Sequence, residues 1–348
     1  MTRYRLFLSS ILMVAVAAGL SAYAGRTPAG ASSGVPLRTF EFTYQVHVPA
    51  NPDTGTAHLW IPLPQPDGFQ DINNLHIDSA VPYMRGRDPE YSNVFALFSP
   101  TAQQSSAGYD VTMRFTATRR EHKTLLDGAS IKDTSASASP DPKLRRYLEP
   151  DKLVPLNGTI SELAKERTAG DTTNIQKARH IYEYVVATMR YDKSGEGWGR
   201  GDAVWACTSK RGNCTDFHSL FIGMMRSSGI PARFEIGFSL PETKTEGDIP
   251  GYHCWAEFYL EGVGWVPVDA SEAWKNPAKH DYFFGAHDAN RIFFTYGRDI
   301  RLSADQKGDP LNYFIYPYAE ANGQPVKNLQ THFAFRDVAP PPEVTAGH

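Results

Sequence analysis

The sequence of 348 residues contains little cysteine: Cys207, Cys214 and Cys254 are its three thiols. Three cysteines are too few for a disulfide scaffold, and an odd number leaves at least one thiol unpaired. A disulfide between Cys207 and Cys254 would leave Cys214 free, and the sequence leaves open whether that bond forms. Because Cys254 follows His253 on a predicted strand, we expect its side chain on the opposite face of the strand.

Charge of one sign and long apolar runs are also scarce. The 35 lysines and arginines oppose 38 aspartates and glutamates, for a formal net charge of −3. A protein that binds a phosphate backbone needs a basic surface, so nucleic acid is not an expected partner. After the first 20 residues, no apolar run approaches the roughly 20 residues that a transmembrane helix needs. We therefore expect no stable membrane insertion of the mature protein.

The N-terminus has the features of an export signal. Arg3 and Arg5 precede an apolar stretch over residues 6–20, and a small-residue cleavage pattern ends at Ala24. This order of a basic region, an apolar region and small residues predicts a signal peptide over residues 1–24. We expect the mature protein to be exported to the periplasm or secreted. The alternative is an uncleaved segment that anchors the chain to the membrane.

The remaining chain divides by its patterns. Residues 25–36 are rich in Gly, Ala, Ser and Pro and indicate a linker. Period-two alternation within residues 37–135, as in RTFEFTYQVHV and YDVTMRFTATRR, predicts an antiparallel β-sandwich. Helical and strand patterns mix over 145–300, short strands follow over 301–337, and 338–348 indicates a disordered tail. The fold class expected is α+β, with the sandwich preceding a mixed domain and a C-terminal β extension.

Cys214 lies at the predicted start of a helix. Apolar residues recur at helical spacing after it, at Phe217, Leu220, Phe221, Met224 and Met225. The preceding stretch GDAVWACTSKRGNC lacks such spacing and is expected to be a loop, in which Gly212 allows a tight turn. The positive end of a helix dipole favours a thiolate, which is the nucleophilic form of cysteine.

A histidine and an aspartate delimit the next predicted hairpin. His253 begins the run HCWAEFYL, Asp269 ends the run WVPVDA, and residues 261–264 form the turn. A thiol, an imidazole and a carboxylate from separate elements form the arrangement that acyl transfer uses: nucleophile, base and orienting group. A plain hairpin would not set Asp269 opposite His253, so we expect a bulge near Pro267.

Two other readings concern the same residues. His218 and Asp216 follow Cys214 on the helix. We interpret His218 as an ordinary helix residue that points away from the thiol, and Asp216 as a partner of the helix dipole.

The soft ligands of the region suggest a competing hypothesis, a zinc-binding or non-catalytic module. These ligands are Cys207, Cys214, His218, His253 and Cys254. No C-x-x-C or H-x-x-x-H pair preorganises them, and no acidic loop has calcium-ligand spacing. The sequence therefore predicts neither a metal nor a cofactor.

The motifs resemble those of bacterial transglutaminase-like superfamily proteins, relatives of the papain-like cysteine enzymes. The matching elements are GNC at residues 212–214, RSSGIPAR at 226–233, HCWAE at 253–257 and WVPVD at 265–269. The resemblance covers about residues 150–300. It implies a papain-like cysteine-enzyme core with Cys214, His253 and Asp269 as its catalytic triad.

The resemblance also guides the expectations for the oxyanion site and the substrate. The family often adds an upstream aromatic or amide side chain to the backbone N–H of the nucleophile, and Tyr191 and Trp205 are the candidates here. We expect a protein or peptide substrate, with cell-wall peptide among the possibilities. The polar loop over residues 241–251 shows no evident channel for a lysine side chain, which favours hydrolysis of an amide over cross-linking. A true transglutaminase that uses amine acceptors is the alternative.

Overall fold

The computed structural model describes three stretches of the chain: residues 35–51, 56–126 and 141–339. They belong to one compact unit, Val35–His348. The expected signal peptide, most of the linker and residues 340–348 of the expected tail lie outside the described residues. None of the described helices combines the length and the hydropathy that a bilayer-spanning helix needs.

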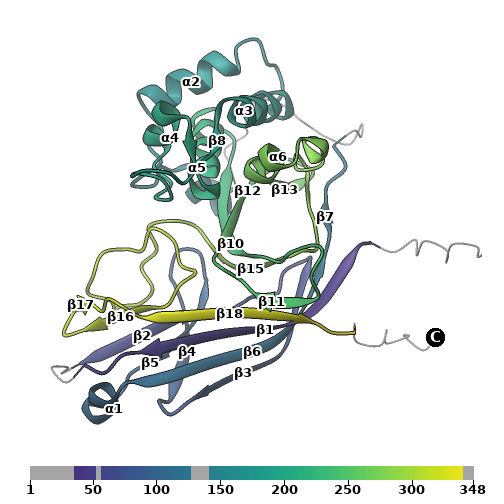
Figure 1. The fold of residues 1–348 in the computed structure, drawn as a ribbon. Coiled ribbons are helices and arrows are strands. Elements are labelled where there is room, and N and C mark those ends of the chain that lie inside the picture. The colour runs from purple at the N-terminus through teal and green to yellow at the C-terminus, as the bar shows by residue number, and fades with distance from the viewer. Residues whose placement is uncertain (1–34, 52–55, 127–140, 340–348) are drawn as a thin grey trace, which may run out of the picture. The chain divides into compact units, whose positions relative to one another are not determined.

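Two five-stranded antiparallel sheets form the sandwich expected from the N-terminal alternation (Figure 1). The first has the order β11 (Glu246–Asp248), β18 (Gln330–Asp337), β1 (Leu37–Val48), β6 (Tyr109–Arg120) and β3 (Gln70–Ser79). The second has the order β17 (Gln324–Pro325), β16 (Tyr318–Ala321), β2 (Ala57–Pro62), β5 (Val94–Phe98) and β4 (Tyr83–Arg87). Phe40, Phe42 and Tyr44 of β1 are buried because alternate residues of a strand face the same side.

The C-terminal strands complete this sandwich. β18 pairs with β1, with Tyr44 opposite Phe333, and β16 pairs with β2, with Trp60 opposite Tyr318. Residues 301–337 therefore contribute strands to both sheets of the N-terminal sandwich. Figure 1 shows the yellow C-terminal strands lying beside the purple and blue N-terminal ones. The loop over residues 241–251 also reaches this sandwich, because β11 pairs with β18.

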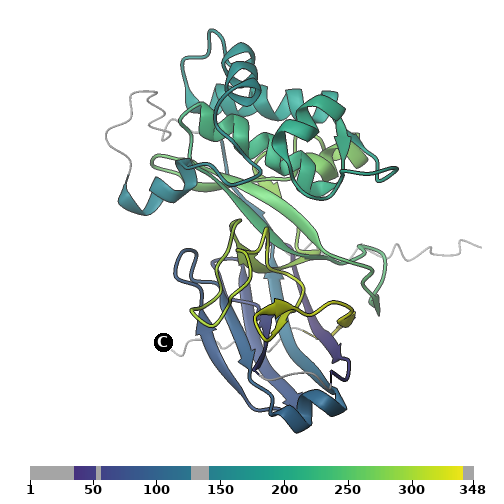
Figure 2. The same cartoon turned by 90° about the vertical axis from the view of Figure 1, so that its left-hand side faces the viewer.

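A four-stranded antiparallel sheet and a group of helices form the rest of the unit. The sheet has the order β13 (Gly264–Val268), β12 (His253–Leu260), β10 (Ala232–Ser239) and β15 (Arg291–Tyr296). The helices are α2 (Thr159–Arg167), α3 (Asn174–Thr188), α4 (Ala203–Ser209), α5 (Cys214–Ser227) and α6 (Ala270–Lys275). Figures 1 and 2 show the helices on the side of this sheet that faces away from the sandwich.

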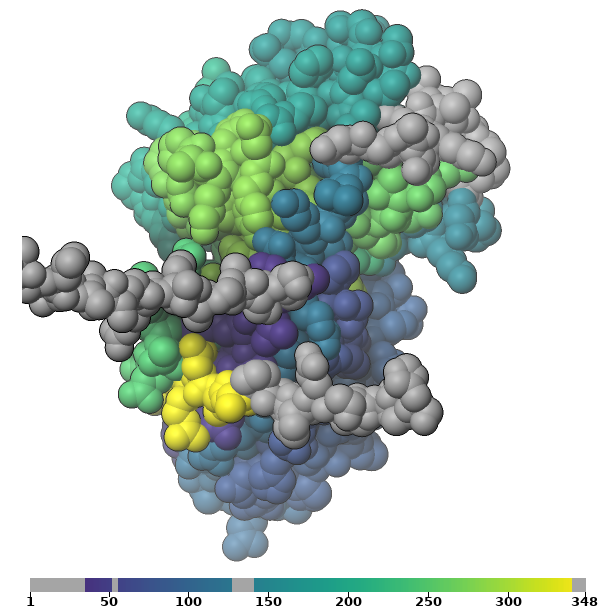
Figure 3. Space-filling model, turned by 90° about the vertical axis from the view of Figure 1, so that its right-hand side faces the viewer, coloured from purple at the N-terminus to yellow at the C-terminus, as the bar shows by residue number. Residues whose placement is uncertain are grey.

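The remaining elements are short. They are α1 (Ala102–Ala107), β7 (His122–Lys123), η1 (Pro142–Leu148), β8 (Arg190–Tyr191), β9 (Arg211–Gly212), η2 (Pro277–Lys279) and β14 (Ala286–His287). β7 pairs with β14, so the end of the N-terminal segment is fixed to the chain that follows α6. On the face drawn in Figure 3, the blue residues of the β7 segment adjoin the light-green residues around α6.

Aromatic side chains join the sandwich to the four-stranded sheet. The ring of Phe42 on β1 lies 5.2 Å from Phe238 on β10 and 5.9 Å from Phe294 on β15, measured between ring centroids. Phe238 also lies 4.6 Å from Phe333 on β18. These contacts belong to one hydrophobic core that extends from the sandwich to the helices. The sandwich thus supports the sheet that carries His253.

Helix α5 is the central helix and is buried from Cys214 to Arg226. It ends before Gly229, whose φ of +77° suits glycine. The segment before it was expected to be a loop, and that expectation was wrong: residues 203–209 form α4. Asp202 caps α4 by accepting a hydrogen bond from the backbone N–H of Trp205 at 3.0 Å. The 7 residues of α4 make about two turns, which is too short for a clear apolar period.

Candidate active site

The start of α5 is a tightly hydrogen-bonded turn. Asn213 is the N-cap, and its side-chain oxygen accepts the N–H of Thr215 at 2.9 Å. The carboxylate of Asp216 accepts the N–H of Asn213 at 2.9 Å. Gly212 packs so closely on this carboxylate that a Cβ there would lie 2.3 Å from its Oδ2. Glycine is therefore required directly before the N-cap, and Cys214 follows in the first turn of the helix.

Asp216 does more than the dipole interaction expected for it. It is fully buried and also accepts the N–H groups of Gly199 and Gly201, at 2.7 Å and 3.0 Å. Burial raises the pKa of this carboxyl against the effect of its hydrogen bonds. The residue thereby ties the 199–201 segment to the turn that carries Cys214.

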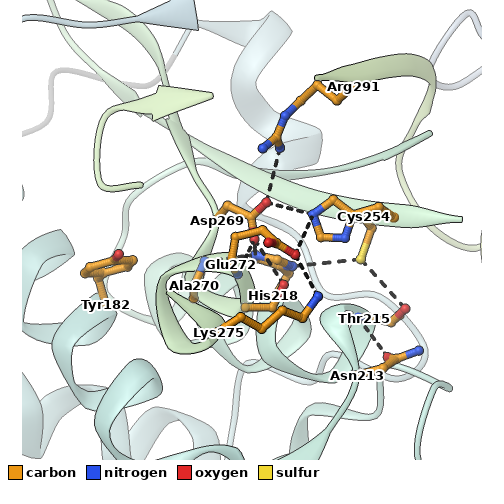
Figure 4. Close-up of polar contacts among 12 residues, drawn as sticks. Tyr182, Asn213, Thr215, His218, Cys254, Asp269, Ala270, Glu272, Lys275 and Arg291 are labelled. Carbon is orange, nitrogen blue, oxygen red and sulfur yellow. Dashed lines mark hydrogen bonds and ion pairs between the residues drawn. The ribbon is translucent and has the colours of Figure 1, made fainter. Parts of the chain in front are cut away.

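Asp269 accepts several hydrogen bonds at this site. It follows β13 and caps α6, accepting the N–H of Glu272 at 3.0 Å. Its Oδ2 accepts hydrogen bonds from His253 Nε2 at 2.7 Å and from Arg291 Nη1 at 3.1 Å. Figure 4 shows the side chain of Arg291 reaching Asp269. Asp269 and Arg291 are 0% and 2% exposed, so these charges interact away from water. Burial raises the pKa of the Asp269 carboxyl, but His253 and Arg291 outweigh burial and hold it well below its usual range.

His253 and Cys214 form a buried acid–base pair. Burial lowers the pKa of His253, but the charge and hydrogen bond of Asp269, with a hydrogen bond to Cys214, raise it to about 10. Burial raises the pKa of the Cys214 thiol, but hydrogen bonds from Cys254 and His253 and the charge of His253 hold it well below its usual range. Because Nε2 of His253 is bonded to Asp269, Nδ1 is the nitrogen that remains for Cys214. Thiolate and imidazolium are thus the favoured states.

The bulge expected near Pro267 is absent from β13. Residues 264–268 pair with β12 in continuous register, and Pro267 lies opposite Glu257. Asp269 meets His253 because the chain leaves the strand at Asp269 and turns into α6. A register shift does occur one strand away, between Ile236 and Gly237 where β10 pairs with β15.

That register shift lies beside His253 and Cys254. Gly237 and Ile236 pair with His253 and Cys254, respectively, on the other edge of β10. Cys254 was expected to face away from the site, and this was wrong: its Sγ lies 3.7 Å from Thr215 Oγ1 and hydrogen-bonds with Cys214. β12 itself pairs with β10 in continuous register, and Cys254 faces α5, where its Sγ also lies 3.8 Å from His218 Nδ1. All three cysteines are free thiols, so Cys207 and Cys254 are not joined.

His218 was expected to be an ordinary helix residue, and the structure contradicts this. Its side chain is fully buried, with Nδ1 3.8 Å from Cys254 Sγ and Nε2 3.6 Å from Asp269 Oδ1. Nε2 accepts the N–H of Ala270 at 3.2 Å, so His218 is neutral and carries its proton on Nδ1. Burial lowers its pKa, which agrees with a neutral ring. The i, i+4 spacing to Cys214 was the signal for this residue.

Of the two oxyanion candidates, Tyr191 lies beside the segment that leads into Cys214. It pairs with Gly212 in the short parallel ladder of β8 and β9. Burial raises the pKa of its phenol, and the charge of Cys214 is the next cause. Trp205 instead packs beside Gly197, and the Arg211 guanidinium lies 5.7 Å from its ring.

Polar and aromatic residues of the strands around His253 stabilise the sheet. Arg233 on β10 lies opposite Glu257 on β12 and forms an ion pair with it. Trp255 is fully buried and donates its indole N–H to Glu235 at 2.6 Å. These pairs fix β10 against β12, and with them the position of His253.

One group of potential metal ligands occurs in the described residues, and it is remote from Cys214 in the sequence. Ligand atoms of Glu183, His280 and Asp281 lie within 4.8 Å of one another. Arg179 forms ion pairs with both carboxylates of this group, which already balances part of their charge. The five residues of the zinc hypothesis do not form such a group in residues 35–51, 56–126 and 141–339.

Comparisons with other proteins agree with this architecture. Residues 161–270 match the model of the transglutaminase-like superfamily. An uncharacterized protein of Haemophilus influenzae (strain ATCC 51907 / DSM 11121 / KW20 / Rd) is 28% identical over an alignment of 366 residues that covers 92% of this chain and 96% of that protein. The uncharacterized protein YebA of Bacillus subtilis (strain 168) is 34% identical over 149 residues, which cover 38% of this chain and 20% of YebA.

A solved structure shows the same fold. The crystal structure of a candidate cysteine protease from Cytophaga hutchinsonii matches with a TM-score of 0.62 at 15% sequence identity. The match covers 88% of this chain and 92% of that chain. The chain therefore contains a transglutaminase-like domain, within an α+β fold shared with that protein.

Proposed function

We propose that this chain is a cysteine-dependent acyl-transfer enzyme in which Cys214 is the nucleophile, His253 the base and Asp269 the orienting group. One observation carries the proposal: a buried thiol in the first turn of α5 is paired with an imidazole whose other nitrogen is bonded to a buried carboxylate at 2.7 Å. A structural cysteine needs neither a base nor an orienting group. This arrangement is the one that activates a thiol for attack on a carbonyl.

The proposed mechanism follows from these positions. The Cys214 thiolate attacks an amide carbonyl, and the carbonyl electrons move to the oxygen. The Cys214 N–H and the Tyr191 hydroxyl are the proposed donors to that oxyanion. The His253 imidazolium gives its proton to the leaving amine, which leaves a thioester and neutral His253. His253 then takes a proton from water as the water attacks the thioester, and collapse of the intermediate releases the acid and restores the Cys214 thiolate beside the His253 imidazolium.

We propose water rather than an amine as the acyl acceptor. An amine-using enzyme needs a carboxylate or a groove to position the ammonium, and the loop over residues 241–251 offered the candidates. Glu242 of this loop lies 3.4 Å from Lys279, and Asp248 lies 2.9 Å from His332. Glu246 lies opposite Arg336 in the pairing of β11 with β18. Each of the three carboxylates therefore has a basic residue beside it, which supports hydrolysis of a protein or peptide substrate. Cell-wall peptide is one such substrate for an exported enzyme, and export is proposed on the N-terminal sequence.

The test of the proposal compares two cysteine variants of the purified protein. Cys214→Ala should lower peptide or amide turnover by a factor of about 10⁴ or more while the melting temperature changes little. Cys207→Ala removes a half-buried free thiol of α4. This variant is the matched control and should keep full turnover. Turnover by Cys214→Ala at the wild-type rate would refute the proposal.

The acceptor is tested separately by partition. An acyl donor is turned over with increasing primary amine, and free acid and amine adduct are both quantified. Hydrolysis predicts that acid dominates at millimolar amine. A dominant adduct would instead identify a transglutaminase.

A further inference from the structure

The approach to the thiol is lined by a few partly exposed side chains. Cys214 and His253 are only 2% and 5% exposed, so a substrate meets their neighbours first. Tyr191 is half-buried and pairs with Gly212, two residues before Cys214. The side chains of Glu272 and Lys275, both on α6, are 27% and 35% exposed. Charge on these neighbours will therefore act on any substrate that reaches Cys214.

Lys275 lies close to His253 and to the ring of Tyr191. Its Nζ contacts Glu272 Oε1 at 2.6 Å (Figure 4). The same oxygen lies 3.9 Å from His253 Nε2. The two contacts share one atom, so the ammonium is within about 6.5 Å of the His253 ring. Nζ also lies 4.0 Å from the centroid of the Tyr191 ring. This cation–π contact fixes the ammonium at the approach to the thiol.

A second ammonium lies over the same aromatic ring. Lys193 Nζ is 5.7 Å from the centroid of Tyr191 and 5.8 Å from that of Trp198. No carboxylate of the described residues lies within 4.0 Å of Lys193 Nζ, and the adjacent Asp192 is 3.8 Å from Arg211. Two ammonium groups and one carboxylate, that of Glu272, therefore give the Tyr191 side of the approach a net positive charge.

We propose that Lys193 and Lys275 form an anion-binding subsite that selects acyl donors with a carboxylate next to the scissile carbonyl. The inference rests on the proposed function, because the subsite matters only if Cys214 attacks the substrate. Lys193 offers its ammonium directly, and Lys275 can exchange Glu272 for the substrate carboxylate. Lys275, within about 6.5 Å of the His253 ring, lies inside the ~8–10 Å range over which salt leaves charges incompletely screened. The same field disfavours the ammonium of an amine acceptor, in agreement with hydrolysis.

The test uses reagents in place of the unidentified substrate. Two methanethiosulfonates of similar size, one with a sulfonate and one with an ammonium, are reacted with the full-length protein. Intact-mass spectrometry follows modification of Cys214 in a background of Cys207→Ala. The ratio of the sulfonate rate to the ammonium rate reports the local charge. Lys193→Met and Lys275→Met should each lower this ratio about two- to five-fold, the range for one exposed charge pair.

Two further variants make the result specific. Glu272→Gln should raise the ratio, because it frees Lys275 from its partner. Lys165→Met should leave it unchanged, since Lys165 lies with Ser227 and Ser228 at the other end of α5, about 20 Å along the helix. Raising the salt from 50 mM to 500 mM should lower the ratio of the sulfonate rate to the ammonium rate in the wild-type protein.

The outcomes separate this inference from the proposed function. Ratios that stay unchanged in both lysine variants, with Cys214 still reacting rapidly, would overturn the subsite and leave the nucleophile intact. Slow modification of Cys214 by both reagents in every variant would instead count against the proposed function. As a final readout, kcat/KM for a glutamate peptide relative to its glutamine counterpart should fall in the lysine variants and not in Lys165→Met.

Discussion

Asp269→Asn removes the orienting charge while keeping the shape of the side chain. The pKa of His253 is about 10 in the protein and 6.5 ordinarily, a difference that corresponds to roughly 5 kcal/mol at 1.36 kcal/mol per pKa unit. The Asp269 charge and hydrogen bond are the largest causes that raise it. Without them, burial disfavours the imidazolium, so we expect the His253 pKa to fall below 7. The pKa of Cys214 should then rise, because its neighbour is no longer positive.

The variant also affects stability, through Arg291. Breaking a buried ion pair leaves an uncompensated charge, at a cost of about 3–5 kcal/mol. Arg291 keeps a second carboxylate, Asp288 at 3.4 Å, so we expect a loss near 3 kcal/mol in the free energy of unfolding. Asp269→Asn combined with Arg291→Met should recover part of the lost free energy of unfolding. It should not restore the raised pKa of His253.

Three measurements check this prediction. NMR titration of histidine-labelled protein gives the His253 pKa, the rate of alkylation by iodoacetamide against pH gives the Cys214 pKa, and urea denaturation gives the stability. A His253 pKa that stays near 10 in Asp269→Asn would refute the role given to the carboxylate.

The remaining predictions concern the pair of Cys214 and His253, the turn before α5 and the hydrophobic core. His253→Ala should move the midpoint of Cys214 alkylation up to the free-thiol value of about 8.5, and an unchanged midpoint would argue against the ion pair. Gly212→Ala should cost about 1–3 kcal/mol in urea denaturation, because a Cβ there overlaps a buried carboxylate, whereas Gly68→Ala has open space and should be nearly neutral. Phe42→Ala should cost about 3–5 kcal/mol and leave the alkylation profile of the folded protein unchanged.

The elements that the sequence predicts well are those whose signals are local. The apolar spacing after Cys214 predicts α5, and the alternation around Phe42 predicts β1. The hairpin of β12 and β13 has its turn at the expected residues, between Leu260 and Gly264. In each case the neighbours that stabilise the element are only a few positions away in the chain.

The parts that the sequence does not predict depend on distant pairings. Nothing local to Phe333 indicates that its strand pairs with β1, almost 290 residues earlier. Cys254 faces α5, and nothing in the hairpin of β12 and β13 indicates that the start of this helix, with Cys214, packs on that face. Arg291 reaches Asp269 from β15 across 22 residues and has no motif of its own. His218 is the exception, since helical spacing alone relates it to Cys214.

The most direct test of the central claim is to trap the acyl-enzyme. The wild-type protein is mixed with a library of peptides, quenched in acid within milliseconds to seconds, and analysed by intact-mass and peptide-mapping mass spectrometry. The account predicts an added acyl group on Cys214 as a thioester that hydroxylamine removes. It predicts no such adduct in Cys214→Ala and accumulation of the thioester in His253→Ala if acylation still occurs there. An acyl group that maps to another residue, or turnover of a peptide that forms an adduct equally in Cys214→Ala, would contradict it.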